Sequence, residues 1–218
     1  MRDTQVTGAG LRHLVGLTAL EDLFCNPKKD ANLGMEYIGH LRQLRQLDVG
    51  SSGITDEGIP KLASLVNLAR LDLLGTRVTG RTLGSLKGLV KLRSLGLCDA
   101  RIDDDGMGEI GTLTSLETLD LGGARITDRG AAHVKNLTRL KMLALSDTRV
   151  TDSVAPLVAE LTNLESLYLD NTELTDTGLG QLRKLRRLTE LWVKNTKVTN
   201  EGVRSFKAAL PECNVVFP

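Results

Sequence analysis

The chain has 218 residues, of which 41% are hydrophobic but only 3% are aromatic, so its core must be built mainly from aliphatic side chains. Its 28 Lys and Arg residues nearly balance its 27 Asp and Glu residues, and the net charge of +1 excludes a whole-molecule attraction to nucleic acid or to an anionic membrane surface. No apolar run approaches the roughly 18 residues that a membrane-spanning helix needs.

The first residues resemble the second half of a unit that recurs along the rest of the chain. Residues 4–11 match the segment that begins at residue 76, so the chain enters in mid-repeat. No strand would then cover Leu20, Leu23 and Cys25 from that side. Because solenoids usually cap such an edge, we expect the chain to be truncated or fused in origin. The start also lacks the apolar stretch of a signal peptide.

The pattern Leu-x-x-Leu-x-Leu recurs every 24 residues without insertion or deletion (44 − 20, 68 − 44, and so on to 188 − 164). Val or Cys replaces the third Leu in three copies. The constant period predicts a solenoid of about eight repeats. The copies begin at Leu20, Leu44, Leu68, Leu92, Leu116, Leu140, Leu164 and Leu188.

One copy illustrates the predicted unit. Apolar residues at 47 and 49 alternate with polar ones, which predicts a short strand with one buried face. Thr55 and Asp56 offer oxygen atoms for a helix N-cap, and Ile59, Leu62 and Leu65 then form one stripe of a helix. Successive strands lie about 4.8 Å apart, and helices are wider than strands. The stack must therefore curve with the strands on the inside. We therefore predict an α/β horseshoe with a parallel sheet on the concave face and helices on the convex face. Its inward positions in this copy are 44, 47, 49, 54, 59, 62 and 65.

The corner after each strand carries a small residue. A Thr there can donate its hydroxyl to neighbouring backbone, whereas Ala100 and Ala124 must rely on backbone or water. In the first copy, residues 26–32 lack the apolar corner residue, which indicates either a loose corner or a grafted binding loop. The corner column reads Ser52, Thr76, Ala100, Ala124, Thr148, Thr172 and Thr196.

The chain ends on a segment that predicts one more strand. Residues 211–217 have a strand pattern with no helix after it, so we expect a strand-like cap at 211–218. Together with the partial repeat at the N-terminus, this predicts a single domain over residues 1–218.

Thr-Asp-x-Gly segments begin several predicted helices, at residues 55–58, 127–130 and 175–178. These segments and the period resemble bacterial leucine-rich-repeat proteins whose units carry Thr-Asp-x-Gly-Leu. The repeats are also similar to those of F-box-associated proteins and, more remotely, of ribonuclease inhibitor. Those two families usually have longer units and a Cys between helix and strand, which this chain lacks. The resemblance implies protein binding, usually on the strand face.

No motif for catalysis, a metal or a cofactor is found in the sequence. His13 and His133 occupy one column five repeats apart (133 − 13 = 5 × 24), roughly 24 Å along the stack, so they cannot share a metal. Residues 103–105 are three acids that lack the other ligands of a calcium loop, and we interpret them as a charged helix cap. We expect a chain that is not an enzyme, takes no cofactor and contacts neither nucleic acid nor membrane. A reducing, cytoplasmic location fits the odd number and unrelated spacing of Cys25, Cys98 and Cys213.

One side chain per repeat, between the two buried strand positions, must point onto the concave surface. This column holds three of the six aromatic side chains of the chain. We expect Tyr168 and Trp192 to form a binding hot spot for a partner protein of unknown identity, with Asp170 and Lys194 as polar neighbours. Asp120, Asp72 and Asp48 would extend the site as an acidic row. The alternatives are two rings that only shield the sheet and, for the whole chain, a spacer in a larger protein. The column reads Phe24, Asp48, Asp72, Gly96, Asp120, Ala144, Tyr168 and Trp192.

A basic row follows the corner. Four guanidinium groups about 5 Å apart repel one another unless counter-charges lie between them. Nearby acids in the sequence favour neutralisation within the chain, and a site for an acidic partner is the alternative. The row is Arg77, Arg101, Arg125 and Arg149, followed by Glu173 and Lys197, and the acids are Asp99, Asp147, Asp104, Asp128 and Asp152.

Overall fold

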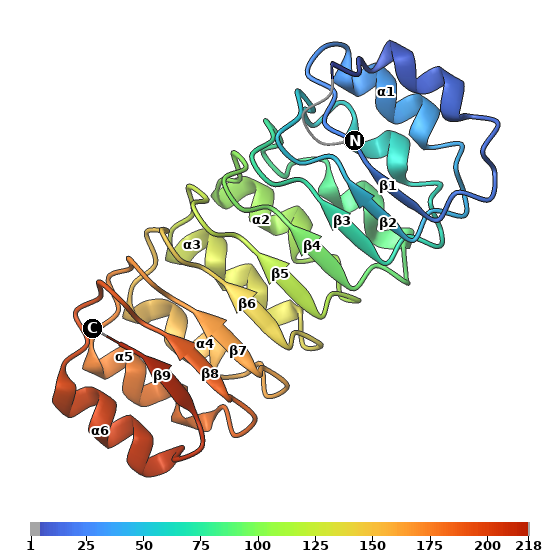
Figure 1. Ribbon diagram of the computed structural model, residues 1–218. Helices are drawn as coiled ribbons and strands as arrows, with labels where there is room; N and C mark the ends of the chain where they lie inside the picture. Colours follow the sequence, from blue (N-terminus) through green and yellow to red (C-terminus); the bar gives the residue numbers. More distant parts are fainter. Residues whose placement is uncertain (1–4, 218) are drawn as a thin grey trace.

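The structure is a computed structural model that describes residues 5–217. Nine strands of three residues lie side by side in one sheet, in the order in which they occur in the chain (Figure 1). The first strand and the last strand therefore lie at opposite ends of an elongated molecule. The strands are β1 (Asp22–Phe24), β2 (Gln46–Asp48), β3 (Arg70–Asp72), β4 (Ser94–Gly96), β5 (Thr118–Asp120), β6 (Met142–Ala144), β7 (Ser166–Tyr168), β8 (Glu190–Trp192) and β9 (Asn214–Val216).

Every strand pairs with the next in parallel, and the paired residues are 24 positions apart. Leu23 pairs with Leu47 at one end of the sheet, and Leu191 pairs with Val215 at the other. The sequence period is thus the strand register, and β9 is the final strand that the C-terminal pattern predicted. Thr4 and Pro218, which belong to the predicted terminal segments, lie outside the described residues.

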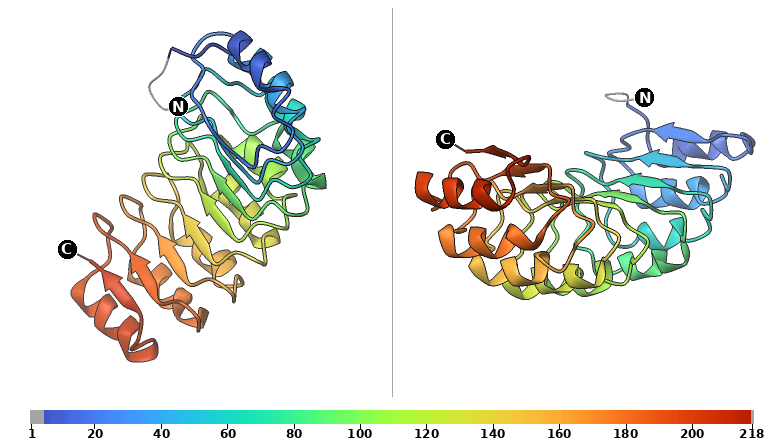
Figure 2. Two further views of the ribbon diagram at one scale, coloured as in Figure 1. Left: turned by 45° about the vertical axis from the view of Figure 1, so that its right-hand side comes forward. Right: turned by 90° about the horizontal axis from the view of Figure 1, so that it is seen from below.

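A helical segment follows each of the first eight strands and returns the chain to the next one. These segments lie on the outer side of an arc whose inner side is the sheet, so the predicted curved α/β solenoid is confirmed (Figure 2). Several are 3₁₀-helices rather than α-helices, because the repeat leaves room for only one or two turns. One more segment, η1 (Ala9–Leu14), precedes β1. The segments after the strands are α1 (Ala31–Ile38), η2 (Ile59–Leu62), η3 (Leu83–Gly88), α2 (Asp104–Ile110), α3 (Asp128–Ala131), η4 (Ala132–Asn136), η5 (Asp152–Val154), α4 (Ala155–Val158), α5 (Asp176–Gln181), η6 (Leu182–Lys184) and α6 (Asn200–Ala209).

The core is one continuous stack of aliphatic side chains between the sheet and the helices. All seven predicted inward positions of the copy at residue 44 are buried, with no more than 1% of any side chain exposed. Each repeat covers the core of its neighbour, so stability comes from the interfaces between successive repeats.

The hydrogen bonds at the corners are those that the corner residue types predict. Thr148 Oγ1 donates to Leu145 O at 2.6 Å, and the other corner threonines make the same bond. Ala100 and Ala124 keep only the backbone hydrogen bond of the turn. The irregular corner of the first copy is not loose, because Gly8 N donates to Lys29 O and Gly53 N donates to Pro27 O.

An aspartate at the start of each of several helical segments bridges two repeats. Asp104 accepts hydrogen bonds from Thr127 N and Thr127 Oγ1, each at 2.7 Å. Thr127 Oγ1 in turn accepts from Arg129 N and so caps α3, as the sequence predicted for this position. The threonine therefore caps its own helix, while the aspartate fixes the start of the next one. The same bridge joins Asp56 to Thr79, Asp128 to Thr151, Asp152 to Thr175 and Asp176 to Thr199.

The outer edge of β1 is paired with no other strand among residues 5–217. Leu23 and Cys25 are nevertheless buried, and a shallow apolar hollow lined by Leu14, Leu17 and Leu20 borders this edge.

Candidate functional site

The predicted outward column lies on the concave surface of the sheet. Tyr168 is half-buried between Leu167 and Leu169, which are 0% and 1% exposed. Trp192 is its direct partner in the next strand and is also half-buried. Because the inward positions on both sides are filled, neither ring belongs to the core.

The two rings form an aromatic pair, by which we mean Tyr168 and Trp192. Their centroids are 5.9 Å apart and their planes are inclined by 44°. Glu190 joins them: its Oε2 accepts from the Tyr168 hydroxyl at 2.9 Å and its Oε1 accepts from Trp192 Nε1 at 2.8 Å. Both hydrogen-bond donors of the pair are thus used within the chain, and the surface left to a partner is mainly ring carbon.

Sequence reasoning missed Glu190. Strand alternation gave a signal for it, because Glu190 is two residues before Trp192 in β8 and must share its face. The concave surface therefore has a second outward column two residues before the predicted set in every strand, to which Gln46, Arg70 and Ser166 also belong.

The charges of this cluster reinforce the geometry. Hydrogen bonds from Trp192 and Tyr168 lower the pKa of Glu190 below its ordinary 4.5. Burial, together with the Glu190 carboxylate, raises the pKa of Tyr168 above 10.0. At neutral pH the acceptor is therefore charged and the phenol is protonated, so both hydrogen bonds are present.

Of the two predicted polar neighbours, Lys194 contacts the pair and Asp170 contacts Lys194. Lys194 Nζ lies 5.5 Å from the centroid of the Trp192 ring, a cation–π contact of about 0.5–1 kcal/mol at an exposed site. Asp170 Oδ1 accepts from the backbone N of Lys194 at 2.7 Å and fixes the chain as it leaves β8. Tyr168, Trp192, Asp170 and Lys194 thus form one group at the C-terminal end of the sheet.

A hollow of about 370 Å³ adjoins Tyr168 on its N-terminal side. It exists because Gly122 and Ala144 carry little or no side chain between Tyr168 and Asp120. Asp120, Asp147 and Cys98 also line it, so its wall is apolar with acidic groups at its margin.

Cys98 is not an activated thiol. Burial and the neighbouring carboxylates of Asp120 and Asp99 raise its pKa to about 11. Because the thiolate is the reactive form, Cys98 contributes a weakly polar surface to the hollow at neutral pH and no nucleophile.

The other predicted residues lie further along the sheet. Asp48, Asp72 and Asp120 each accept a hydrogen bond at 3.0 Å from the backbone N two residues later, which orients the carboxylates at the ends of their strands. Asp48 and Asp72 border a separate hollow of about 190 Å³. Phe24 is 42% exposed but is seven repeats from Trp192 (192 − 24 = 7 × 24), roughly 34 Å along the sheet, so the structure does not bring it to the aromatic pair.

The acids at 103–105 are used in structural contacts. Asp103 caps α2 by accepting from Gly106 N, and Asp105 pairs with Arg81 and Arg129, each at 3.2 Å. Within residues 5–217, no group of three or more His, Cys, Asp and Glu side chains is placed to hold a metal ion. No helix in the same range is long and apolar enough to cross a membrane.

Comparisons with known proteins agree with this architecture. The family described as a leucine-rich repeat region matches residues 53–213, and the family described as a leucine rich repeat matches residues 40–63. A solved leucine-rich-repeat protein from Leptospira interrogans is similar over 94% of this chain, with a TM-score of 0.51 and 18% identity, a likeness of fold alone. The similarity spans 62% of that protein's chain. No curated protein matches the sequence.

Proposed function

The chain belongs to the leucine-rich-repeat family, and on this premise we propose that it binds a partner protein on the C-terminal half of its concave sheet. Proteins of this family are in general non-enzymatic modules for protein interaction. One observation carries the proposal for the surface: an aromatic pair held by Glu190 on the open face of the sheet.

The aromatic pair has the properties of an interfacial hot spot. Trp and Tyr are enriched among residues whose truncation weakens binding most, because they bury much area at little cost in conformational entropy. Here that cost is reduced further, since Glu190 and the cation of Lys194 already orient the rings. A spacer has no need of a large pair of oriented rings on a solvent-facing sheet.

The surroundings specify the chemistry of the partner. The rings and the hollow beside Tyr168 offer apolar surface, and Asp120 and Asp147 place carboxylates at the margin of that hollow. The complementary group is an apolar or aromatic side chain next to a Lys or Arg.

We also propose that this encounter takes place in the cytoplasm. All three cysteines are unpaired, and Cys25 and Cys213 are buried without a partner, as is usual in a reducing compartment.

The test is capture of partners from the native lysate by the wild-type chain and by the double variant Trp192→Ala/Tyr168→Ala. Truncation of a hot-spot ring costs about 2 kcal/mol or more, roughly thirtyfold in affinity, so the captured protein should be lost from the variant. A matched control is Val66→Ala/Val90→Ala, which truncates side chains that are 55% and 67% exposed outside the strands. Equal capture by a folded double variant and by the control would contradict the proposal.

A further inference from the structure

The four arginines of the row after the corner are stacked in register. Arg77 N donates to Ile54 O at 3.0 Å, Arg125 N to Ile102 O at 2.9 Å and Arg149 N to Ile126 O at 3.0 Å. These bonds, at three of the four positions, form part of a second ladder beside the main sheet. The 24-residue period places successive arginines about one strand spacing, roughly 5 Å, apart. All four side chains are exposed. We call Arg77, Arg101, Arg125 and Arg149 the arginine row.

The expected neutralisation of this row within the chain is wrong. Across residues 5–217, none of its guanidinium groups forms an ion pair or a side-chain hydrogen bond. The cap acids expected to balance it are turned to the threonines of the next repeat, as in the bridges from Asp104 and Asp128. Asp147 accepts instead from the Asn171 amide at 2.8 Å. The row therefore presents several positive charges with no matching acid in contact.

Several other cations of the solenoid form ion pairs. At the opposite end of the strands, Glu117 lies 3.3 Å from Arg93 and 2.8 Å from Lys141. Even in the column of the row itself, the two positions beyond Arg149 hold Glu173 and Lys197, which form an ion pair. What distinguishes the arginine row is that four unpaired arginines follow one another in a single column of the repeat.

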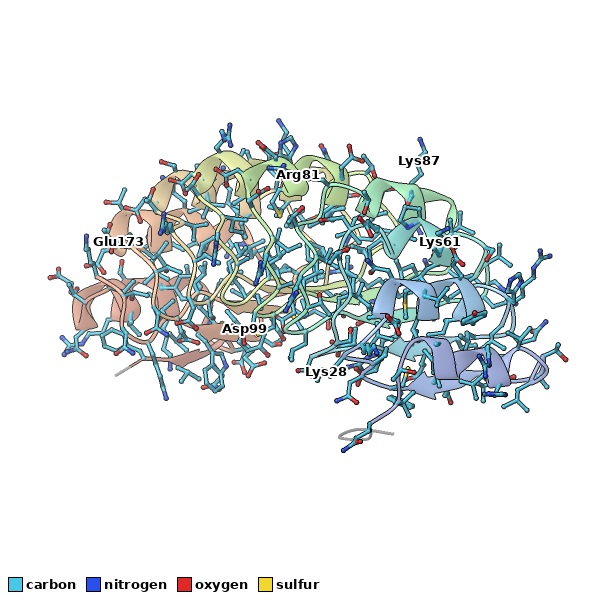
Figure 3. All side chains as sticks on the ribbon, turned by 90° about the horizontal axis from the view of Figure 1, so that it is seen from above. Lys28, Lys61, Arg81, Lys87, Asp99 and Glu173 are labelled. Carbon is cyan, nitrogen blue, oxygen red and sulfur yellow. The ribbon has the colours of Figure 1, made fainter. Side chains whose placement is uncertain are left out.

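A polar hollow of about 530 Å³ lies along this stretch. Arg77, Arg101, Arg125 and Lys28 line it, and Gly53 and Gly75 leave it open. Asp99 is its only carboxylate among the described residues. Figure 3 shows Lys28 and Asp99 on the inner side of the arc, away from Lys87 on the helical side.

We propose that this basic flank binds an acidic, extended segment of a partner protein. Carboxylates on one side of an extended peptide recur every 6–7 Å or so, within reach of long arginine side chains that are stacked about 5 Å apart and can fork to carboxylate oxygens. No aromatic side chain lines the hollow, so it lacks the stacking surface on which single-stranded nucleic acid depends. The flank does not contain the aromatic pair, although its hollow shares Asp99 and Gly123 with the hollow beside Tyr168. The test below changes residues of the row alone, so its failure is distinguishable from failure of the function proposed above.

The test uses a fluorescein-labelled peptide of about ten glutamates, long enough to span the row, at low ionic strength. We expect saturable binding that weakens as the salt concentration rises. The affinity should fall roughly tenfold in Arg101→Ala/Arg125→Ala, because that variant lacks two exposed charge contacts. Lys87→Ala/Lys135→Ala removes the same charge from the helical side and should leave the affinity within about twofold of wild type.

The thermal stability of each variant separates a binding role from a structural one. Because the row is unpaired, Arg101→Ala/Arg125→Ala should unfold at the wild-type temperature or slightly above it, through relief of repulsion. An equal loss of peptide binding in Arg101→Ala/Arg125→Ala and in Lys87→Ala/Lys135→Ala would show that net charge alone determines binding. That result would overturn the proposal. Tighter binding of a thymidine oligonucleotide of matched charge, or no peptide binding at all, would overturn it as well.

Discussion

At the scale of single residues, Glu190 determines how the aromatic pair is presented. One carboxylate accepts from both rings, so its protonation should release them. Since the pKa of Glu190 is lowered in the folded chain, this stabilisation is complete above about pH 4.5 and is lost as the pH falls through the lowered value.

We therefore predict an acid transition in the fluorescence of Trp192, the single tryptophan of the chain, while far-UV circular dichroism still reports the folded solenoid. In Glu190→Gln the side chain does not titrate, so this step should be absent. A transition of equal size in Glu190→Gln would show that other acids cause it.

The glycine of the Thr-Asp-x-Gly segment has a steric role that the structure explains. A Cβ added at Gly178 would lie 2.3 Å from Asp152 Oδ1 and 2.7 Å from Leu174 Cδ1, so it would displace the carboxylate that bridges to Thr175. At Gly180, in the same helix α5 (Asp176–Gln181), nothing lies within 4 Å of an added Cβ.

Gly178→Ala should therefore lower the free energy of unfolding by about 1–3 kcal/mol. Gly180→Ala should leave it unchanged or raise it by up to about 1 kcal/mol, because Ala is the better helix former. Denaturant unfolding of the two variants measures both changes. Equal effects at the two positions would mean that the close approach to Asp152 is not what requires glycine.

At the scale of the repeat, the bridging acids couple neighbouring units. The carboxylate of Asp104 takes bonds from Thr127, Gly130 and Arg129. Burial alone would raise its pKa, but these bonds outweigh it and lower the pKa below 3.8. In the same column Asn32 makes the corresponding bridge, with its Oδ1 accepting from Thr55 N at 3.0 Å and its Nδ2 donating to Thr55 Oγ1 at 2.8 Å.

Asp104→Asn should therefore keep the bridge and cost about 1 kcal/mol or less, whereas Asp104→Ala should cost about 2–4 kcal/mol by leaving part-buried donors unpaired. The advantage of Asp over Asn should shrink as the pH falls below about 3.8 and vanish once the pH is below the lowered pKa of the native carboxylate. Unfolding curves of both variants over that range measure it. A loss in Asp104→Asn as large as in Asp104→Ala would contradict the assignment of Asn32 as an equivalent bridge.

The repeat also shows where sequence reasoning succeeds and where it stops. The period of 24 fixed the strand register, the inward positions and the adjacency of Tyr168 and Trp192, because all three depend only on stacking equal units. The period did not determine which of two nearby groups a given side chain would bond to. Asp104 is near both the arginine row and Thr127, and only its side-chain conformation shows that it binds the threonine and Arg129. The hollow beside Tyr168 depends on small side chains in several strands at once, which no single repeat reveals.

At the scale of the whole molecule, opposite charges lie on two different surfaces of one rigid stack. The concave sheet carries the aromatic pair with Asp120, Asp72 and Asp48, and one flank carries the arginine row. A near-zero net charge conceals this separation. A partner that engages both surfaces would need an apolar and basic patch next to an acidic segment, and such a pattern restricts which proteins can bind.

The fluorescence of Trp192 during titration with the captured partner tests the central proposal most directly, because the chain has no other tryptophan. A partner that lacks tryptophan, or a fragment with its tryptophans replaced, keeps the signal specific. Burial of the half-exposed ring at the interface should shift its emission to shorter wavelength and reduce its quenching by acrylamide, with the same saturation point as binding. Saturated binding with unchanged emission and quenching would show that the partner does not cover the aromatic pair.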